Sequence, residues 1–160
     1  MYGQCTNHQN SVKDTANKFP LGIWSMGDYN HTLYFNANGG KFSTQVSDEY
    51  SSNGKYSAKV TYTGTGYVRY KITDVQEYCS KTIIFSANVN TPAPLELAIF
   101  YQINGQYTQV KVDIPADSCD DYTVSTTLPS EGVSQILFSL DSRQTTTFSC
   151  YTDDWQLNIP

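Results

Sequence analysis

The stretch FSCYTDDWQLNI, residues 148–159, decides how the rest of this chain is interpreted. Its apolar residues alternate at Tyr151, Trp155, Leu157 and Ile159, with an interruption at Asp153. Alternation with a period of two is the pattern of a β-strand that buries one face. The adjacent carboxylates of Asp153 and Asp154 are costly inside such a strand unless a cation, a backbone amide turn or a lysine compensates their charge.

The remainder of the chain also has the composition of a β-protein. It has 160 residues, enough for one domain; 39% of them are hydrophobic, only 16% are charged and 13 are tyrosines. This mixture favours half-exposed sheets over helices. About ten short segments, many of them alternating and separated by turn residues, predict an all-β fold, either a two-sheet antiparallel β-sandwich or a barrel. We expect residues 1–18 to be a linker or irregular lead-in and residues 19–160 to form the domain.

The charge and hydropathy of the chain argue against several partners. A net charge of -5 and an isoelectric point of 4.8 argue against nucleic acid, whose phosphates are bound by clustered lysine and arginine. The chain has no run of about 18 apolar residues, so we expect no membrane insertion. Its start lacks the basic-then-apolar pattern of a secretory signal, and we expect the sequence to come from a longer precursor with further domains attached.

The four cysteines indicate two disulfides rather than a zinc site, because they form no Cys-x-x-Cys pair. Disulfides, together with the glycosylation sequon at Asn30, point to a secreted or cell-surface protein. If successive strands reverse direction, Cys119 and Cys150 fall at one end of the sandwich. This favours a Cys119–Cys150 disulfide and leaves Cys5 with Cys79. The alternative is that the cysteines are reduced and unpaired.

The outward-facing residues of four predicted strands form a candidate binding face. The four strands begin at Tyr67, Leu95, Gln106 and Val133. Sugar rings bind where aromatic side chains cover their apolar faces and planar polar groups bond their hydroxyls. The predicted ligand-binding residues are Tyr67, Arg69, Lys71, Glu96, Phe100, Gln102, Tyr107, Gln109, Lys111 and Gln135, with Trp24 as a further candidate on a loop. The alternative is a register error that turns Phe100 inward, since solvent-facing tyrosine and lysine are common in β-proteins.

Three segments, in order along the chain, resemble strands of one family. Residues 52–60 (SNGKYSAKV), 82–89 (TIIFSANV) and 151–157 (YTDDWQL) are similar to strands of jelly-roll carbohydrate-binding modules, in the group that includes families 4, 9 and 22. The resemblance covers residues 19–160. It implies a jelly-roll β-sandwich without catalytic activity that binds a neutral polysaccharide on its open sheet face.

The resemblance also implies a structural calcium ion near the last strand. The matching ligand is Asp153 or Asp154, and Asp48 and Glu49 are candidates for further oxygen ligands, because calcium binds six to eight oxygens. The family's usual N-terminal Asn-x-Gly-Phe-Glu segment has no counterpart near residues 19–26. The alternative is that one of the two aspartates caps a β-bulge by accepting backbone amides.

Two other functions are compatible with the sequence. A cell-surface adhesion or scaffold domain would use the same face to bind a protein partner. A jelly-roll polysaccharide lyase or hydrolase would need catalytic groups. The only histidines, His8 and His31, lie in polar, turn-like stretches, and no Gly-x-Ser-x-Gly motif occurs. We therefore expect no enzyme activity.

Overall fold

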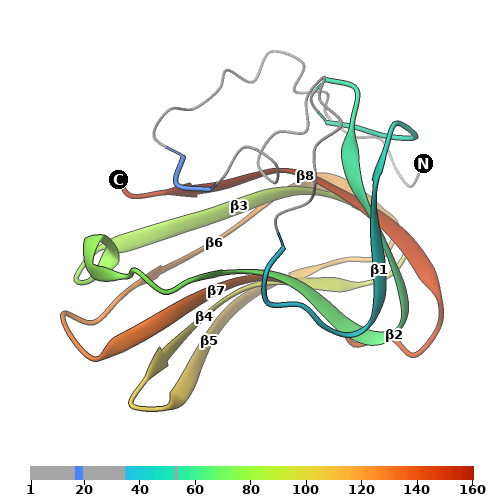
Figure 1. The fold of residues 1–160 in the computed structure, drawn as a ribbon. Helices are drawn as coiled ribbons and strands as arrows, with labels where there is room; N and C mark the ends of the chain where they lie inside the picture. The colour runs from blue at the N-terminus through green and yellow to red at the C-terminus, as the bar shows by residue number, and fades with distance from the viewer. Residues whose placement is uncertain (1–16, 20–34, 53) are drawn as a thin grey trace.

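The computed structural model describes residues 17–19, 35–52 and 54–160, and its regular structure there is almost entirely β-strand (Figure 1). The described strands are β1 (Gly39–Ser47), β2 (Ser57–Ile72), β3 (Thr82–Thr91), β4 (Leu95–Ile103), β5 (Gln106–Ile114), β6 (Ser118–Thr127), β7 (Val133–Ser142) and β8 (Phe148–Asn158). One turn of 3-10 helix, Gln76–Tyr78, precedes β3. The predicted all-β class is confirmed. Trp24, Cys5 and the sequon at Asn30 lie outside the described residues.

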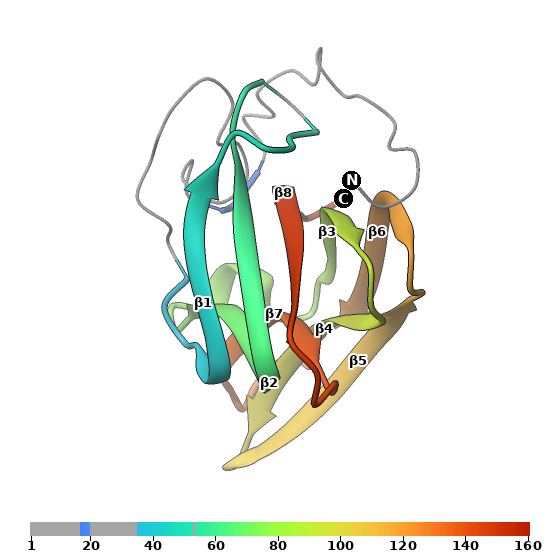
Figure 2. The same ribbon diagram turned by 90° about the vertical axis from the view of Figure 1, so that its right-hand side faces the viewer.

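The strands form two layers that share β2 (Figures 1 and 2). The order of hydrogen-bonded neighbours is β5-β4-β7-β2-β8-β3-β6, and β1 pairs with the other edge of β2. The first half of β2 pairs with β8 from Ala58 to Tyr62, and the second half pairs with β7 from Gly66 to Ile72. All these pairings are antiparallel, so the predicted two-sheet antiparallel jelly-roll sandwich is confirmed.

β2 is one continuous strand, although the sequence Gly64-Thr65-Gly66 predicts a turn between two strands. The two glycines instead permit β1 to come close. A Cβ added to Gly66 would lie 3.0 Å from the backbone nitrogen of Lys41, and one added to Gly64 would lie 3.0 Å from the Lys41 side chain. Glycine inside a strand often marks such a close approach. The chain therefore stays extended here and passes from one sheet to the other.

The core lies between the two layers and is rich in aromatic rings. Trp155, Phe85 and Phe138 are fully buried. The Phe85 ring lies 5.0 Å from Trp155 and 5.3 Å from Phe138, measured between ring centroids. Phe19 meets Phe138 edge-on at 5.0 Å. Tilted and edge-on ring pairs of this kind stabilise a core beyond the area that they bury.

β8 buries residues on both of its faces, and a bulge changes which of them face the main core. Trp155 lies in the main core as expected, but Tyr151 packs in a separate cluster beside Tyr50. The backbone of Asp154 has a positive φ of 52°, and the register between β8 and β3 shifts close to this residue. An extra residue moves the alternation by one position. Cys150 therefore faces the core in the place that the alternation predicts for Tyr151.

Both predicted disulfide pairings are wrong, because Cys150 and Cys79 are free thiols. Cys119 of β6 pairs in register with β3, whereas Cys150 of β8 pairs with β2. β3 lies between β6 and β8, so Cys119 and Cys150 are about 10 Å apart across two strand spacings, beyond the reach of a disulfide. The prediction assumed strands that reverse in simple succession, but β8 inserts between β2 and β3. Burial raises the pKa of the Cys150 thiol.

Residues 17–19 lie along β8. The Lys18 nitrogen donates to the Leu157 carbonyl at 2.9 Å, and the Leu157 nitrogen donates to Asn17 Oδ1 at 2.9 Å. Asn17 and Lys18, which the sequence analysis assigned to the lead-in, thus hydrogen-bond to the last strand. The domain boundary at residue 19 stays a prediction. Within the described ranges, no helix has the length and hydropathy needed to cross a membrane.

Candidate functional site

The outer face of the sheet formed by β2, β7, β4 and β5 brings together the ten predicted strand residues. Asp141 of β7 lies opposite both Tyr67 of β2 and Glu96 of β4. Gln102 of β4 lies between Gln135 of β7 and Tyr107 of β5. These two sets of cross-strand neighbours lie at opposite ends of the face. The residues of the face that lie between them are Arg69, Lys71, Phe100, Gln109 and Lys111. Phe100 points outward, because the Arg69 guanidinium lies over its ring on this face. The predicted orientation of Phe100 is therefore correct, and the alternative that turned it inward is wrong.

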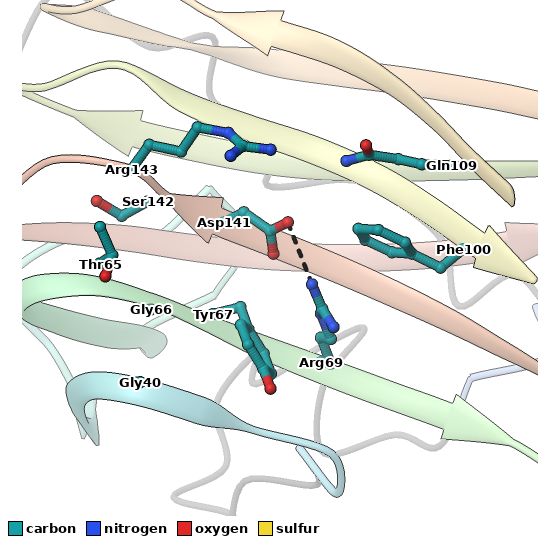
Figure 3. A pocket seen from close by; sticks show the side chains of 10 residues that line it. All are labelled: Gly40, Thr65, Gly66, Tyr67, Arg69, Phe100, Gln109, Asp141, Ser142 and Arg143. Atoms are coloured by element: carbon teal, nitrogen blue, oxygen red, sulfur yellow. Dashed lines mark hydrogen bonds and ion pairs between the residues drawn. The ribbon is translucent and has the colours of Figure 1, made fainter. Parts of the chain in front are cut away.

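A groove of 620 Å³ opens on this face (Figure 3). Its lining residues are Gly40, Thr65, Gly66, Tyr67, Arg69, Phe100, Gln109, Asp141, Ser142 and Arg143. They come from β1, β2, β7, β4 and β5 and from the residue that follows β7, so the groove runs across the sheet. Tyr67, Arg69, Phe100 and Gln109 were predicted for the site, and the other lining residues were not.

Arg69 lies between the two aromatic rings of the groove. Its Cζ is 3.6 Å from the centroid of the Tyr67 ring and 4.3 Å from that of Phe100. Its Nε donates to Ser139 Oγ at 2.7 Å, and its Nη2 donates to Asp141 Oδ2 at 3.4 Å, the contact dashed in Figure 3. A guanidinium over an aromatic face is attracted by the ring quadrupole. Arg69 therefore fixes both rings and the carboxylate in one arrangement.

The Asp141 carboxylate is buried beneath this arrangement. Burial raises its pKa, while a hydrogen bond from Ser139 and the charge of Arg69 act in the opposite direction. Ser139 Oγ donates to Asp141 Oδ1 and accepts from Arg69, so the three side chains form a closed set of hydrogen bonds. A buried carboxylate is tolerated when it is paired and hydrogen-bonded in this way.

Tyr67 is positioned by a glycine behind it. A Cβ on Gly39 would lie 2.5 Å from Tyr67 Cζ, which is closer than any real side chain comes. Gly39 therefore makes room for the ring, and Arg69 lies over the ring as well.

The charged groups along the groove are paired with one another. Glu96 accepts from Lys111 Nζ and from Arg143 Nε, each at 3.1 Å. Lys111 also lies 2.8 Å from Asp113, and its hydrogen bonds to Asp113 and Glu96 raise its pKa. With the Arg69–Asp141 pair, the cations and anions on this part of the face compensate one another.

The predicted calcium ligands do not assemble into one site among the described residues. The Asp153 carboxylate accepts from the backbone nitrogen of Ser52 at 3.3 Å and from its Oγ at 3.1 Å. Asp154 Oδ2 accepts from Ser52 Oγ at 2.7 Å. Asp153 Oδ1 also accepts a hydrogen bond from the Asp154 backbone nitrogen at 3.0 Å. An aspartate that caps a β-bulge by accepting a backbone amide is the alternative that the sequence analysis gave.

The other two predicted ligands lie apart from this pair. Glu49 forms an ion pair with Lys59 at 2.7 Å and accepts from Tyr151 Oη at 3.1 Å. Asp48 is exposed. No group of three or more carboxylate, histidine or cysteine side chains suited to a metal occurs in the described part of the chain. Of the four predicted ligands, the described structure thus joins Asp153 and Asp154 through Ser52, and the calcium ion stays a prediction.

The comparison with known proteins rests on structure, because no protein-family model and no curated protein matches this sequence. A xylan-binding domain of family CBM22 superposes with a TM-score of 0.65 and 10% identity, over 91% of this chain and 96% of its own. The CBM22-1 xylan-binding domain of Paenibacillus barcinonensis Xyn10C gives a TM-score of 0.59 at 17% identity, over 77% of this chain and 84% of its own. This chain has the fold of carbohydrate-binding modules.

Part of an enzyme domain has the same fold. The enzymatically active domain of bacteriophage CBA120 tailspike protein 4 superposes with a TM-score of 0.69 at 8% identity, over 91% of this chain but 22% of its own. The present chain thus spans about a fifth of that domain. At such low identities, all three similarities establish the fold and leave the ligand open.

Proposed function

We propose that this chain is a non-catalytic carbohydrate-binding module that holds a neutral polysaccharide in the groove. The observation that carries the proposal is the lining of the groove. Tyr67 and Phe100 supply aromatic carbon, and Arg69 and Gln109 supply planar hydrogen-bonding groups beside it. A sugar ring needs both kinds of contact. The fold supports the proposal, because the modules that share it include xylan-binding domains.

The pairing of charges supports a neutral ligand. Arg69 is paired with Asp141, and Arg143 with Glu96. An anionic polysaccharide would have to compete with these carboxylates for the same guanidinium groups, and the net charge of -5 would repel it.

Affinity electrophoresis against β-glucans, xylans, mannans and chitin tests the proposal. We expect at least one polysaccharide to retard the wild type, and Phe100→Ala to reduce the retardation because it removes one ring of the groove. Thr123→Ala, on exposed β6 in the other sheet, is the matched control and should behave as the wild type. Absence of retardation by every polysaccharide would refute the proposal and favour an adhesion or scaffold domain that binds protein.

A hydrolase is the second candidate. The tailspike enzyme domain shares the fold, and Asp141 and Glu96 face this side of the sheet from directly opposed positions on β7 and β4. Both carboxylates are held in ion pairs, Asp141 with Arg69 and Glu96 with Lys111 and Arg143. Incubation with the same polysaccharides separates the candidates. Release of new reducing ends identifies a hydrolase, whereas retardation without release supports a binding module.

We also propose that the module is secreted or displayed at a cell surface as part of a longer chain. Modules of this fold occur in tandem in Paenibacillus barcinonensis Xyn10C and beside a GH10 module in Clostridium thermocellum Xyn10B. Mass determination of the protein isolated from its source would test this arrangement directly.

A further inference from the structure

Tyr107 lies on the binding face but outside the groove. Its side chain is the one large hydrophobic group exposed in the described ranges, with 51% of its surface accessible. It precedes the groove residue Gln109 by two positions on β5, so it faces the same side about 7 Å further along the strand. An exposed aromatic residue on its own needs no explanation. The orientation of this one, however, is fixed by a partner.

The Tyr107 ring leans across the sheet instead of pointing into solvent. Tyr107 Oη accepts a hydrogen bond from Gln135 Nε2. The register places Gln102 of β4 between these two residues, so their backbones are about 10 Å apart. The ring can reach Gln135 only if it extends over β4. The two side chains therefore meet across β4, and the Tyr107 side chain, with about half of its surface accessible, is open to a ligand.

Polar groups surround this ring as they surround the rings of the groove. Gln102 Oε1 accepts from Ser134 Oγ at 3.0 Å, and the Gln135 amide is held by the tyrosine hydroxyl. Gln102 and Gln135 are half-buried, Ser134 is exposed, and none of the three carries a charge. An exposed aromatic face next to neutral hydrogen-bonding groups offers a sugar ring the same combination of contacts as the groove.

We propose that Tyr107, with Gln102 and Gln135, forms a second sugar subsite that continues the groove. This inference rests on the proposed function, because it extends the same binding face. Tyr67 and Tyr107 are separated by three strand spacings and by six residues along the strands, a straight-line distance of about 25 Å between their backbones. The module then binds an internal stretch of several sugar units, and its affinity depends on chain length.

Calorimetric titration with trisaccharides and hexasaccharides of xylan, cellulose and mannan tests the subsite. We compare the wild type with Tyr107→Ala. The control is Thr108→Ala, an exposed neighbour whose side chain points to the other face of β5. We expect the wild type and the control to bind the matching hexasaccharide more tightly than the trisaccharide. In Tyr107→Ala the hexasaccharide should no longer bind more tightly than the trisaccharide. We expect its affinity to fall roughly threefold to tenfold, while the affinity for the trisaccharide stays unchanged.

Two results would overturn the second subsite while leaving the proposed function intact. One is equal affinity of wild type and Tyr107→Ala for every ligand that binds. The other is an equal loss for both ligand lengths, which would make Tyr107 part of the groove itself. If the wild type bound none of the oligosaccharides and none of the four polysaccharides, the proposed function would fail and the subsite with it.

Discussion

Replacement of Arg69 by methionine tests how the groove is held together. Methionine keeps an unbranched side chain that can still pack between the Tyr67 and Phe100 rings, but it removes the charge and all donors. In the wild type, Arg69 stacks on both rings and donates to Ser139 and Asp141. The substitution therefore leaves the Asp141 carboxylate buried with Ser139 as its remaining partner in this set.

The free energy of unfolding should fall by about 3 kcal/mol at neutral pH. Loss of the two cation–π contacts and of the hydrogen bond to Ser139 accounts for roughly 1–2 kcal/mol, since methionine restores part of the packing. The remainder comes from the Asp141 carboxylate, because removing one partner of a largely buried ion pair leaves the other charge uncompensated.

The loss should depend on pH, and its sign follows from Asp141. Burial raises the pKa of this carboxyl in the folded protein, so between the unfolded and folded pKa values the folded state binds more protons. Stability therefore falls as the pH rises through this window. Without the Arg69 charge the folded pKa is higher still, and the fall is larger. We expect the deficit of Arg69→Met to be reduced to the part from lost packing and the Ser139 hydrogen bond at acidic pH, below the ordinary pKa of aspartate, and to grow toward neutral pH.

Urea unfolding at acidic and neutral pH, followed by tryptophan fluorescence, measures this difference. Asp141→Asn is the matched variant, because it removes the ionisable group and keeps a similar shape. The double variant Arg69→Met/Asp141→Asn should lose the pH-dependent part of the deficit. A deficit of equal size at both pH values, or one that Asp141→Asn leaves unchanged, would show that the ion pair does not hold the groove.

Three further predictions concern the groove wall, the thiols and the last strand. Gly39→Ala should weaken polysaccharide binding severalfold in a titration because the new Cβ displaces Tyr67; unchanged affinity would contradict this. Iodoacetamide should modify the partly exposed Cys79 in the folded protein and Cys150 only after unfolding, as read by mass spectrometry; equal rates would mean that Cys150 is not buried. If a calcium ion binds Asp153 or Asp154, a chelator should lower the melting temperature; an unchanged melting temperature would remove the ion and leave Ser52 as a donor to the Asp153 carboxylate.

Which residues share the candidate face could be predicted because alternation is a local property of each strand. Once Leu97 and Ile99 are assigned to the core, Glu96 and Phe100 must face outward. The same reasoning, continued along β7 from Gln135, would have reached Asp141, which was missed. Arg143 follows the end of β7, where alternation no longer decides the direction of a side chain.

The last strand shows what local pattern cannot supply. The bulge at Asp154 forms together with hydrogen bonds from Ser52, a residue 102 positions earlier, and it changes which residues of β8 face the core. The predicted pairing of the cysteines failed for a related reason. Whether Cys150 lies near Cys119 depends on the order of strands in the sheet, and the insertion of β8 between β2 and β3 leaves no mark in the sequence next to Cys150.

The strand order also has a consequence for how the protein comes to fold. β7 lies between β4 and β2 in one sheet, and β8 lies between β2 and β3 in the other. The last two of the described strands to be synthesised therefore each occupy an interior position. Among the described strands, only β1–β2 and β4–β5 pair as neighbours along the chain. Pairings that join distant segments form slowly, because the intervening chain must first be closed into a loop. The groove cannot form on a ribosome until β7 has emerged, because Asp141 and Ser142 of its lining belong to that strand.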